Sequence, residues 1–318
     1  MPNLKIIPFD HAHTMIEALE TNADTKASML KSFARRLSGN NIHFFNEPFT
    51  PISLTGTHCS LQCKHCDSHY LQHMLDGSPG KLYSQAANLA NTGAKGILLS
   101  GGSSPDGSVP TYEQADVIQK IKRDLNLKIS AHTGIVNRTQ AQVLAQYLDM
   151  ALVDVIGDDD TIHDILGLDA SAQDYENSLK ELSAAGIPLA PHVIVGLHNG
   201  NLKGEFKALE MVKKFNPEVV VIVVFIPTKG TALEGTAPPK LEDVVKVITT
   251  AREMFDAPLS LSCVRPGGRY RSKLDRYAIL CGIDRIAVPS RSAYTTAREL
   301  GLDIVEIPEM CCSYGVSL

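Results

Sequence analysis

The stretch GTHCSLQCKHC, residues 56–66, contains three cysteines, Cys59, Cys63 and Cys66, in the spacing C-x3-C-x2-C. Thiolates are the ligands that iron–sulfur clusters take from proteins. Three thiolates on one short loop can hold three irons of a cubane, which leaves the fourth iron without a protein ligand. A small molecule can chelate that open iron. The stretch therefore predicts a 4Fe-4S cluster with one exchangeable position.

Two other uses of these cysteines have to be weighed. A structural zinc ion takes four ligands, and His58, His65 or His69 could supply the fourth. A disulfide is disfavoured, because seven cysteines, three of them crowded together and without a signal peptide, indicate a reducing cytoplasm rather than a secreted scaffold.

Length and composition agree with a soluble enzyme. The chain has 318 residues, of which 44% are hydrophobic, and one α/β barrel typically needs about 250 residues. The net charge is −5, and no run of Lys or Arg indicates a nucleic acid or an anionic membrane surface as a partner. No apolar stretch reaches the roughly 20 residues that span a bilayer.

Short apolar runs alternate with amphipathic stretches along the chain. The runs are rich in Ile, Val and Leu with little alternation, which is typical of strands buried on both faces of a parallel sheet. Between them lie helical patterns, one of which begins at Ser171 with Asp174 three residues on and ends at Gly186. Eight such alternations predict a (β/α)8 barrel of the TIM type. The predicted strands are 51–54, 95–99, 127–131, 150–156, 188–195, 219–226, 259–263 and 285–288.

The barrel is expected to occupy residues 46–302. Residues 1–45 contain two helical patterns, 11–19 and 26–37, and should form a helical extension on the bottom or the outer ring of the barrel. Residues 303–318 should form a cysteine-bearing C-terminal tail.

In this fold, chemistry gathers at the C-terminal ends of the strands, and the cysteine loop directly follows the first predicted strand. The cysteine spacing and its position resemble the radical S-adenosylmethionine (SAM) superfamily. That resemblance implies that SAM binds the open iron and that a 5′-deoxyadenosyl radical abstracts hydrogen from the substrate. Gly101, Gly102 and Ser103, after the second strand, resemble the superfamily's Gly-Gly-Glu motif at the SAM amino group, with Ser103 in place of the glutamate.

Later strand ends add further candidates. His132 is expected either to face the SAM or substrate cavity or to cap the next helix, and Asp154 or Asp158 to hold a ribose hydroxyl or a polar group of the substrate. Residues 192–196 partly match the superfamily's Gly-x-Ile-x-Gly segment along the adenine, which implies contacts from His192 and Val195. Pro227 begins a turn close to the Pro-x-x-Gly-Thr turn of the biotin-synthase-like branch.

Four more cysteines have to be assigned. Cys263 closes the seventh predicted strand at the top of the barrel, and Cys281 ends the following helix at the bottom, which makes it a buried structural cysteine. Cys311 and Cys312 lie in a tail long enough to return to the top. We therefore expect Cys263, Cys311 and Cys312 to hold a second, auxiliary iron–sulfur cluster with an unassigned fourth ligand.

The stretch SCVRPGGRYR at 262–271, the segment 286–290 and the paired terminal cysteines resemble the archaeal-type, two-component lipoyl synthases. The resemblance implies insertion of sulfur at C6 or C8 of a protein-bound octanoyl chain. It also implies an octanoylated carrier protein, a second radical SAM subunit and a low-potential electron donor such as ferredoxin as partners. The alternatives are a biotin-synthase-like enzyme or isomerase with a small free substrate, and a non-catalytic iron–sulfur or zinc subunit.

Overall fold

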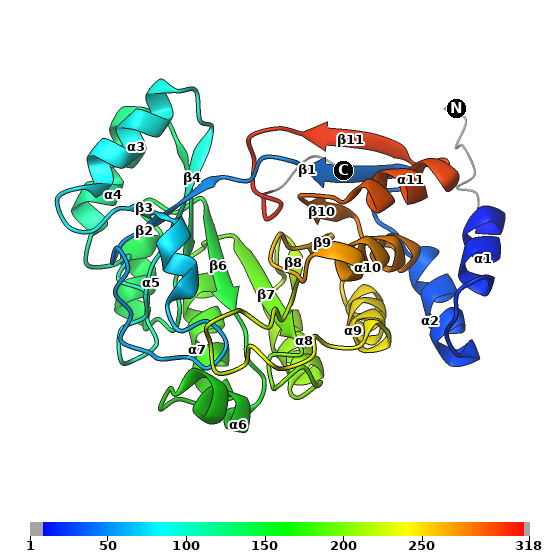
Figure 1. Ribbon diagram of the computed structural model, residues 1–318. Coiled ribbons are helices and arrows are strands. Elements are labelled where there is room, and N and C mark those ends of the chain that lie inside the picture. The colour runs from blue at the N-terminus through cyan, green and yellow to red at the C-terminus, as the bar shows by residue number, and fades with distance from the viewer. Residues whose placement is uncertain (1–8, 315–318) are drawn as a thin grey trace.

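The computed structural model describes residues 9–314, which form one curled, fully parallel sheet with helices on its convex side (Figure 1). All eight predicted strands are present in the predicted order, which confirms the α/β fold class. The strands are β1 (Asn41–Phe45), β2 (Thr50–Ser53), β3 (Leu75–Asp76), β4 (Gly96–Ser100), β5 (Lys128–His132), β6 (Met150–Asp154), β7 (Leu189–Val195), β8 (Val220–Val224), β9 (Leu259–Leu261), β10 (Arg285–Ala287) and β11 (Asp303–Ile307).

The helices follow the strands in the alternation that the sequence predicts. Ser171 caps the helix after β6 in a capping box with Asp174, and Gly186 adopts a positive φ just beyond its end, both as predicted. The helical segments are α1 (Phe9–Glu17), α2 (Ala23–Phe33), η1 (His69–His73), α3 (Leu82–Asn91), α4 (Ala115–Leu125), α5 (Arg138–Leu144), α6 (Asp159–Thr161), η2 (Ile162–Leu166), α7 (Ala172–Ala184), α8 (Glu205–Lys213), α9 (Leu241–Met254), α10 (Gly268–Leu280) and α11 (Arg291–Glu299).

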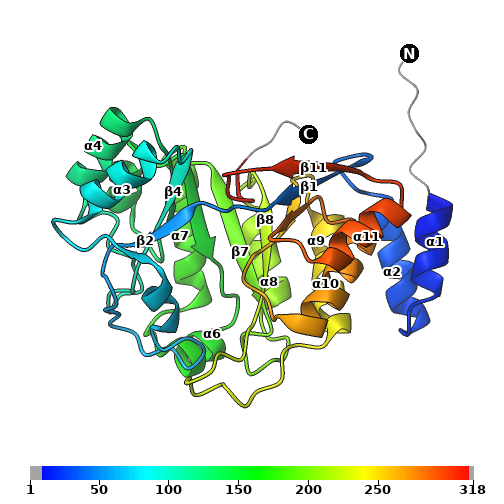
Figure 2. The same ribbon diagram turned by 45° about the horizontal axis from the view of Figure 1, so that its top comes forward.

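The sheet is open, whereas the sequence predicted a closed barrel. Its strand order is β11-β1-β10-β9-β8-β7-β6-β5-β4-β2-β3, and within residues 9–314 no pairing joins the two edges. The reason is that β1 precedes β2 in the chain but pairs with β10, and β11 then covers β1. The two segments expected to flank the barrel, 1–45 and 303–318, therefore each contribute a strand to one edge (Figure 2).

Of the N-terminal helices on the outer ring, α2 packs against α9 and α10, and α1 packs against α2. Asp284, at the start of β10, is fully buried and pairs with Arg252 at 2.8 Å. It also accepts hydrogen bonds from the backbone N–H groups of Leu37 and Ser38, which follow α2. Removing one partner of such a buried pair costs about 3–5 kcal/mol, so this carboxylate anchors the N-terminal segment to the barrel.

Cys281 is fully buried at the end of α10, where its carbonyl accepts a 2.5 Å hydrogen bond from Ser32. Burial raises the pKa of its thiol. This environment agrees with the structural role predicted for Cys281.

The concave side of the sheet encloses a second, smaller core. Alternate residues of β6, β7 and β8 point into it, and Phe49 and Tyr314 fill it from the side of the N-terminal strand ends. The two rings meet edge to face with centroids 5.2 Å apart. The C-terminal tail therefore lies inside the curled sheet. Across the part of the chain that the structure describes, every helix is too short or too polar to traverse a bilayer.

Candidate functional site

The cysteine loop runs from the end of β2 to η1 and is tied to two neighbouring loops by its backbone. Lys64 N–H donates to the carbonyl of Ile165 at 2.8 Å, and the Lys64 carbonyl accepts from Leu233 N–H at 3.2 Å. The Cys63 thiol donates to the carbonyl of Leu166 at 3.3 Å. The loops after β6 and β8 thus fix the position of the cysteine loop at the C-terminal edge of the sheet.

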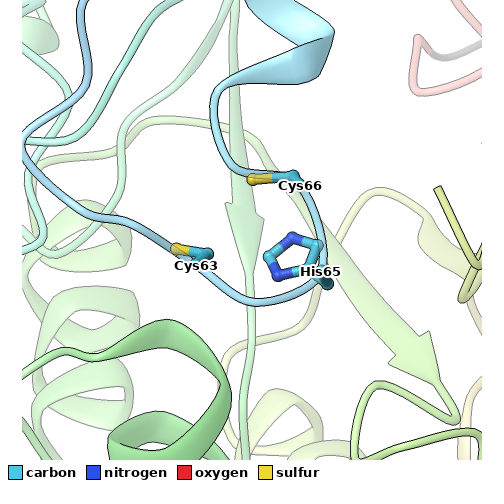
Figure 3. A group of neighbouring side chains, drawn as sticks. All are labelled: Cys63, His65 and Cys66. Atoms are coloured by element: carbon cyan, nitrogen blue, oxygen red, sulfur yellow. The ribbon is translucent and has the colours of Figure 1, made fainter. Parts of the chain in front are cut away.

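Two of the three thiols lie together, with an imidazole beside them (Figure 3). The ligand atoms of Cys63, His65 and Cys66 all lie within 4.8 Å of one another. Hydrogen bonding between the two thiols lowers the pKa of Cys66, and the same interaction together with burial raises the pKa of Cys63. His65 further lowers the pKa of Cys66.

The third thiol, that of Cys59, lies against the glycine turn after β4. Ser103 N–H donates to the Cys59 sulfur at 3.3 Å, and Ser103 O accepts from Ser60 N–H at 2.9 Å. A Cβ on Gly102 would stand 2.0 Å from the His58 carbonyl oxygen and 2.5 Å from the Cys59 Cα. Only glycine allows this approach, which explains Gly102; a Cβ on Gly101 would come no closer than 3.4 Å to its neighbours.

The cysteine loop fits an iron–sulfur cluster in its donor set. It offers three soft sulfur ligands on one loop, and the Ser103 amide already donates to one sulfur. To bind three corners of a cubane, the thiols of Cys63 and Cys66 have to move apart from their present positions, because each binds a different iron.

A polar cluster faces the concave side of the sheet near the cysteine loop. His132 Nδ1 lies 3.7 Å from an Asp154 carboxylate oxygen, and the rings of His132 and His192 are 5.3 Å apart. His192 is buried, its Nδ1 lies 2.8 Å from the Ala190 carbonyl, and desolvation lowers its pKa to about 4. The structure thus brings together three residues that were predicted from separate strands.

His132 does not cap the next helix, because Asn137 caps α5 in a capping box with Gln140. That alternative is wrong. His132 remains partly exposed beside Asp154, and its contact with SAM or substrate stays a prediction.

Asp158 and Val195 were predicted to contact SAM or the substrate, but in the structure Asp158 caps a helix and Val195 lies in the main core. The Asp158 carboxylate caps α6 through the N–H and hydroxyl of Thr161, which leaves Asp154 as the better candidate for a ribose or substrate contact. Val195 is fully buried in the main core, whereas its neighbour Ile194 is half-buried and also contacts the smaller, concave core. Ile194 is therefore the better candidate for a contact in this strand.

Pro227 lies in the loop after β8, and its neighbour Thr228 is hydrogen-bonded to the Tyr70 hydroxyl at 2.8 Å. Desolvation raises the pKa of Tyr70. This contact joins the turn at Pro227 to the cysteine loop. Tyr70 was not predicted from the sequence, although an aromatic residue four positions after Cys66 was a visible signal.

The three cysteines predicted to hold the auxiliary cluster lie in one region of the structure but not in one compact group. Strand β11 runs parallel to β1 up to the C-terminal edge, and the chain then turns so that Cys311 enters the smaller core and Cys312 packs on Phe45 and Ala287. Cys263 is exposed on the loop after β9. Its thiol pKa is raised by desolvation and by the charge of Cys311. Among residues 9–314 these three sulfurs do not form a group within 4.8 Å, so their joint binding of a cluster stays a prediction.

Arg285 is a residue of this region that sequence patterns did not reveal as functional. Its guanidinium is buried inside the sheet and donates to the carbonyl oxygens of Cys312 and Tyr314. An arginine at the start of an apolar strand was the available signal, because a buried charge requires partners.

A groove of about 490 Å³ lies on the outer side of the cysteine loop. Glu113, Asp116 and His58 line it together with Pro79 and Pro110. Leu54 and Val117 line it as well, so its walls combine acidic and apolar side chains.

Comparisons with known proteins give one family match and several similar proteins. The radical SAM superfamily model matches residues 53–212. A 7,8-didemethyl-8-hydroxy-5-deazariboflavin synthase from Archaeoglobus fulgidus is 23% identical over 241 residues, which cover 67% of this chain and 69% of that protein. Methylornithine synthase shares the fold with a TM-score of 0.60 and 16% identity over 93% of this chain and 92% of that one. The hydrogenase maturase HydG shares it with a TM-score of 0.64 and 14% identity over 88% and 66%, respectively. The match over half of the sequence, together with a C-x3-C-x2-C loop at the C-terminal edge of a curled parallel sheet, shows that this chain belongs to the radical SAM superfamily.

Proposed function

We propose that this radical SAM enzyme inserts sulfur into a protein-bound octanoyl chain, as a lipoyl synthase subunit. The observation that carries the proposal is the course of the C-terminal tail. It brings Cys311 and Cys312 from the end of the chain to the curled sheet, where Cys311 lies against the smaller core and Cys312 against Phe45 and Ala287. An enzyme that inserts sulfur needs a sulfur source, and a second cluster held by these thiols meets that need.

The cysteine loop and the tail have separate tasks in this proposal. Cys59, Cys63 and Cys66 hold the 4Fe-4S cluster that binds SAM, and the two cofactors together supply the radical chemistry of the family. The backbone at Gly101 and Gly102 and the side chain of Asp154 orient SAM. The tail holds the sulfur source on the concave side of the sheet.

The apolar residues of β6, β7 and β8 line that concave side and exclude water from a reactive carbon centre. We place the enzyme in the cytoplasm, where the free cysteines remain reduced. Its proposed partners are an octanoylated carrier protein, a second radical SAM subunit and a low-potential donor such as ferredoxin.

The experiment is an anaerobic reaction with an octanoylated carrier peptide, SAM and a strong reductant, with and without a second lipoyl synthase subunit. Thiolated or lipoylated peptide should be seen by mass spectrometry, and reconstituted protein should contain about eight irons per chain. If 5′-deoxyadenosine forms equally fast without the peptide and no sulfur enters the peptide in either arm, the assignment fails.

A second candidate is a radical SAM enzyme with a small free substrate. The cluster of His132, Asp154 and His192 on the concave side favours it, because such groups recognise polar ligands. The similarity to methylornithine synthase and to the deazariboflavin synthase points in the same direction. About four irons per chain, and SAM cleavage that a small polar compound stimulates, would favour this candidate.

A further inference from the structure

We propose that the cysteine loop is also a binding site for a single soft divalent metal ion, Zn²⁺ or Fe²⁺, held by Cys63, His65 and Cys66 without Cys59. This site overlaps the three-cysteine cluster site, because Cys63 and Cys66 belong to both, and differs from it in using His65 in place of Cys59. It stands independently of the function proposed above.

The distances favour one ion over a cubane in the present arrangement. The sulfurs of Cys63 and Cys66 and a ring nitrogen of His65 all lie within 4.8 Å of one another. Around a tetrahedral zinc ion with Zn–S bonds of about 2.3 Å, two thiolates are about 3.8 Å apart. In a cubane the thiolates bind different irons and are separated further. The three ligand atoms are thus closer to the spacing for a single ion.

His65 supplies a second, independent observation. Its Nδ1 is buried and has no hydrogen-bond partner among the described residues. A buried polar atom without a partner is costly, and here it belongs to a ring that lies beside both thiols (Figure 3). A metal ion bonded to an imidazole nitrogen removes that cost.

Cys59 is held apart from this group. Its sulfur accepts from Ser103 N–H at 3.3 Å, and its backbone packs against Gly102. The remainder of the loop is fixed by the hydrogen bonds of Lys64 to the loops after β6 and β8. The structure therefore holds Cys63, His65 and Cys66 together and keeps Cys59 apart from them.

Two thiolates and one imidazole form a donor set that suits Zn²⁺ and Fe²⁺, with the fourth position open to water. Because Cys63 and Cys66 belong to both sites, the single ion and the cubane exclude each other. Bound Fe²⁺ would occupy two of the three predicted cluster ligands without using Cys59. Bound Zn²⁺ blocks assembly.

The test uses full-length apo protein under anaerobic conditions and Co²⁺ as the probe. Intense visible absorption of tetrahedral Co²⁺ with sulfur-to-metal charge transfer should appear at one ion per chain. Cys59→Ala should bind Co²⁺ within about threefold of the unaltered protein. His65→Phe should weaken binding by more than about tenfold, since losing even an outer hydrogen-bond partner costs about 10–100-fold.

Cys66→Ala should abolish the sulfur-to-metal band, and His69→Phe is the matched control on the same segment, expected to bind normally. Circular dichroism establishes that each variant is folded. The proposal is overturned if Cys59→Ala loses binding as fully as Cys66→Ala, or if His65→Phe binds as tightly as His69→Phe.

A second measurement follows the competition between the two sites. One equivalent of Zn²⁺ added before reconstitution with iron and sulfide should prevent the 4Fe-4S absorption, and a chelator should restore it. In His65→Phe the same zinc should inhibit much less. Full cluster formation in zinc-loaded unaltered protein would show that the ligands are not shared, and would overturn the proposal.

Discussion

The guanidinium of Arg285 donates a hydrogen bond of 2.7 Å to the carbonyl oxygen of Tyr314, so the first residue of β10 holds the C-terminal tail inside the curled sheet. The same guanidinium contacts the Cys312 carbonyl at 3.4 Å. This side chain links the sheet to Cys312, one of the cysteines that the proposed auxiliary cluster requires.

Replacing Arg285 by Met should release the tail. The carbonyls of Cys312 and Tyr314 would lose their buried donor, which costs about 1–3 kcal/mol in the free energy of unfolding. Hydrogen exchange should be faster at 311–314, and urea denaturation gives the stability. Arg298→Met, at an exposed position, should change stability by less than about 0.5 kcal/mol. Unchanged exchange at 311–314 in Arg285→Met would contradict the anchoring role.

Gly102→Ala should disrupt the cysteine loop. The new methyl group would lie 2.0 Å from the His58 carbonyl oxygen and 2.5 Å from the Cys59 Cα, so the loop must shift, at a cost of about 1–3 kcal/mol. Iron content and SAM cleavage should fall strongly. Gly235→Ala is the control, because nothing lies within 4 Å of a Cβ there. Full iron content in Gly102→Ala would refute the close approach.

His192 should make stability depend on pH. Its pKa in the folded protein is lowered to about 4, and the unfolded value is about 6.5. Between these values the unfolded chain binds one more proton, so stability falls as the pH drops below about 6.5 and reaches a loss on the order of 3 kcal/mol near pH 4.

Urea denaturation of the unaltered protein and of His192→Gln from pH 7.5 to 4.5 measures how much His192 contributes to the loss of stability on acidification. The His192→Gln variant should lose less stability on acidification than the unaltered protein. His13→Gln, at an exposed site on α1, should follow the unaltered curve. Parallel curves for His192→Gln and the unaltered protein would show that His192 is not buried in its neutral form.

Cys312→Ala should remove the proposed auxiliary cluster and leave the cysteine-loop cluster in place. Reconstituted protein should retain the absorption and SAM cleavage of the cysteine-loop cluster, and lose about four irons and all transfer of sulfur. Cys281→Ala removes a buried thiol far from both sites. It should keep its full iron content and only lose stability, by about 1 kcal/mol or more. Equal iron content in Cys312→Ala and the unaltered protein would refute a second cluster at the tail.

The eight barrel strands could be predicted because each is a local run of apolar residues between turn signals, and all eight are present. Strands β1 and β11 could not be predicted as edge strands. Which strands they pair with is decided by contacts between residues far apart in the chain, such as Phe45 with Ala287 and with Ile307. For the same reason the sequence predicted a closed barrel, whereas the sheet is open.

The sequence alone predicted the cluster ligands and identified the family, because three thiols within one loop and a Gly-Gly turn are local features whose chemistry needs no distant partner. Only the tertiary structure decided where the tail goes, that Asp158 caps a helix while Asp154 faces His132, and that His65 joins two of the three thiols. Those outcomes depend on which side of a strand or loop each side chain occupies. Burial and hydrogen bonding across the whole sheet determine that choice.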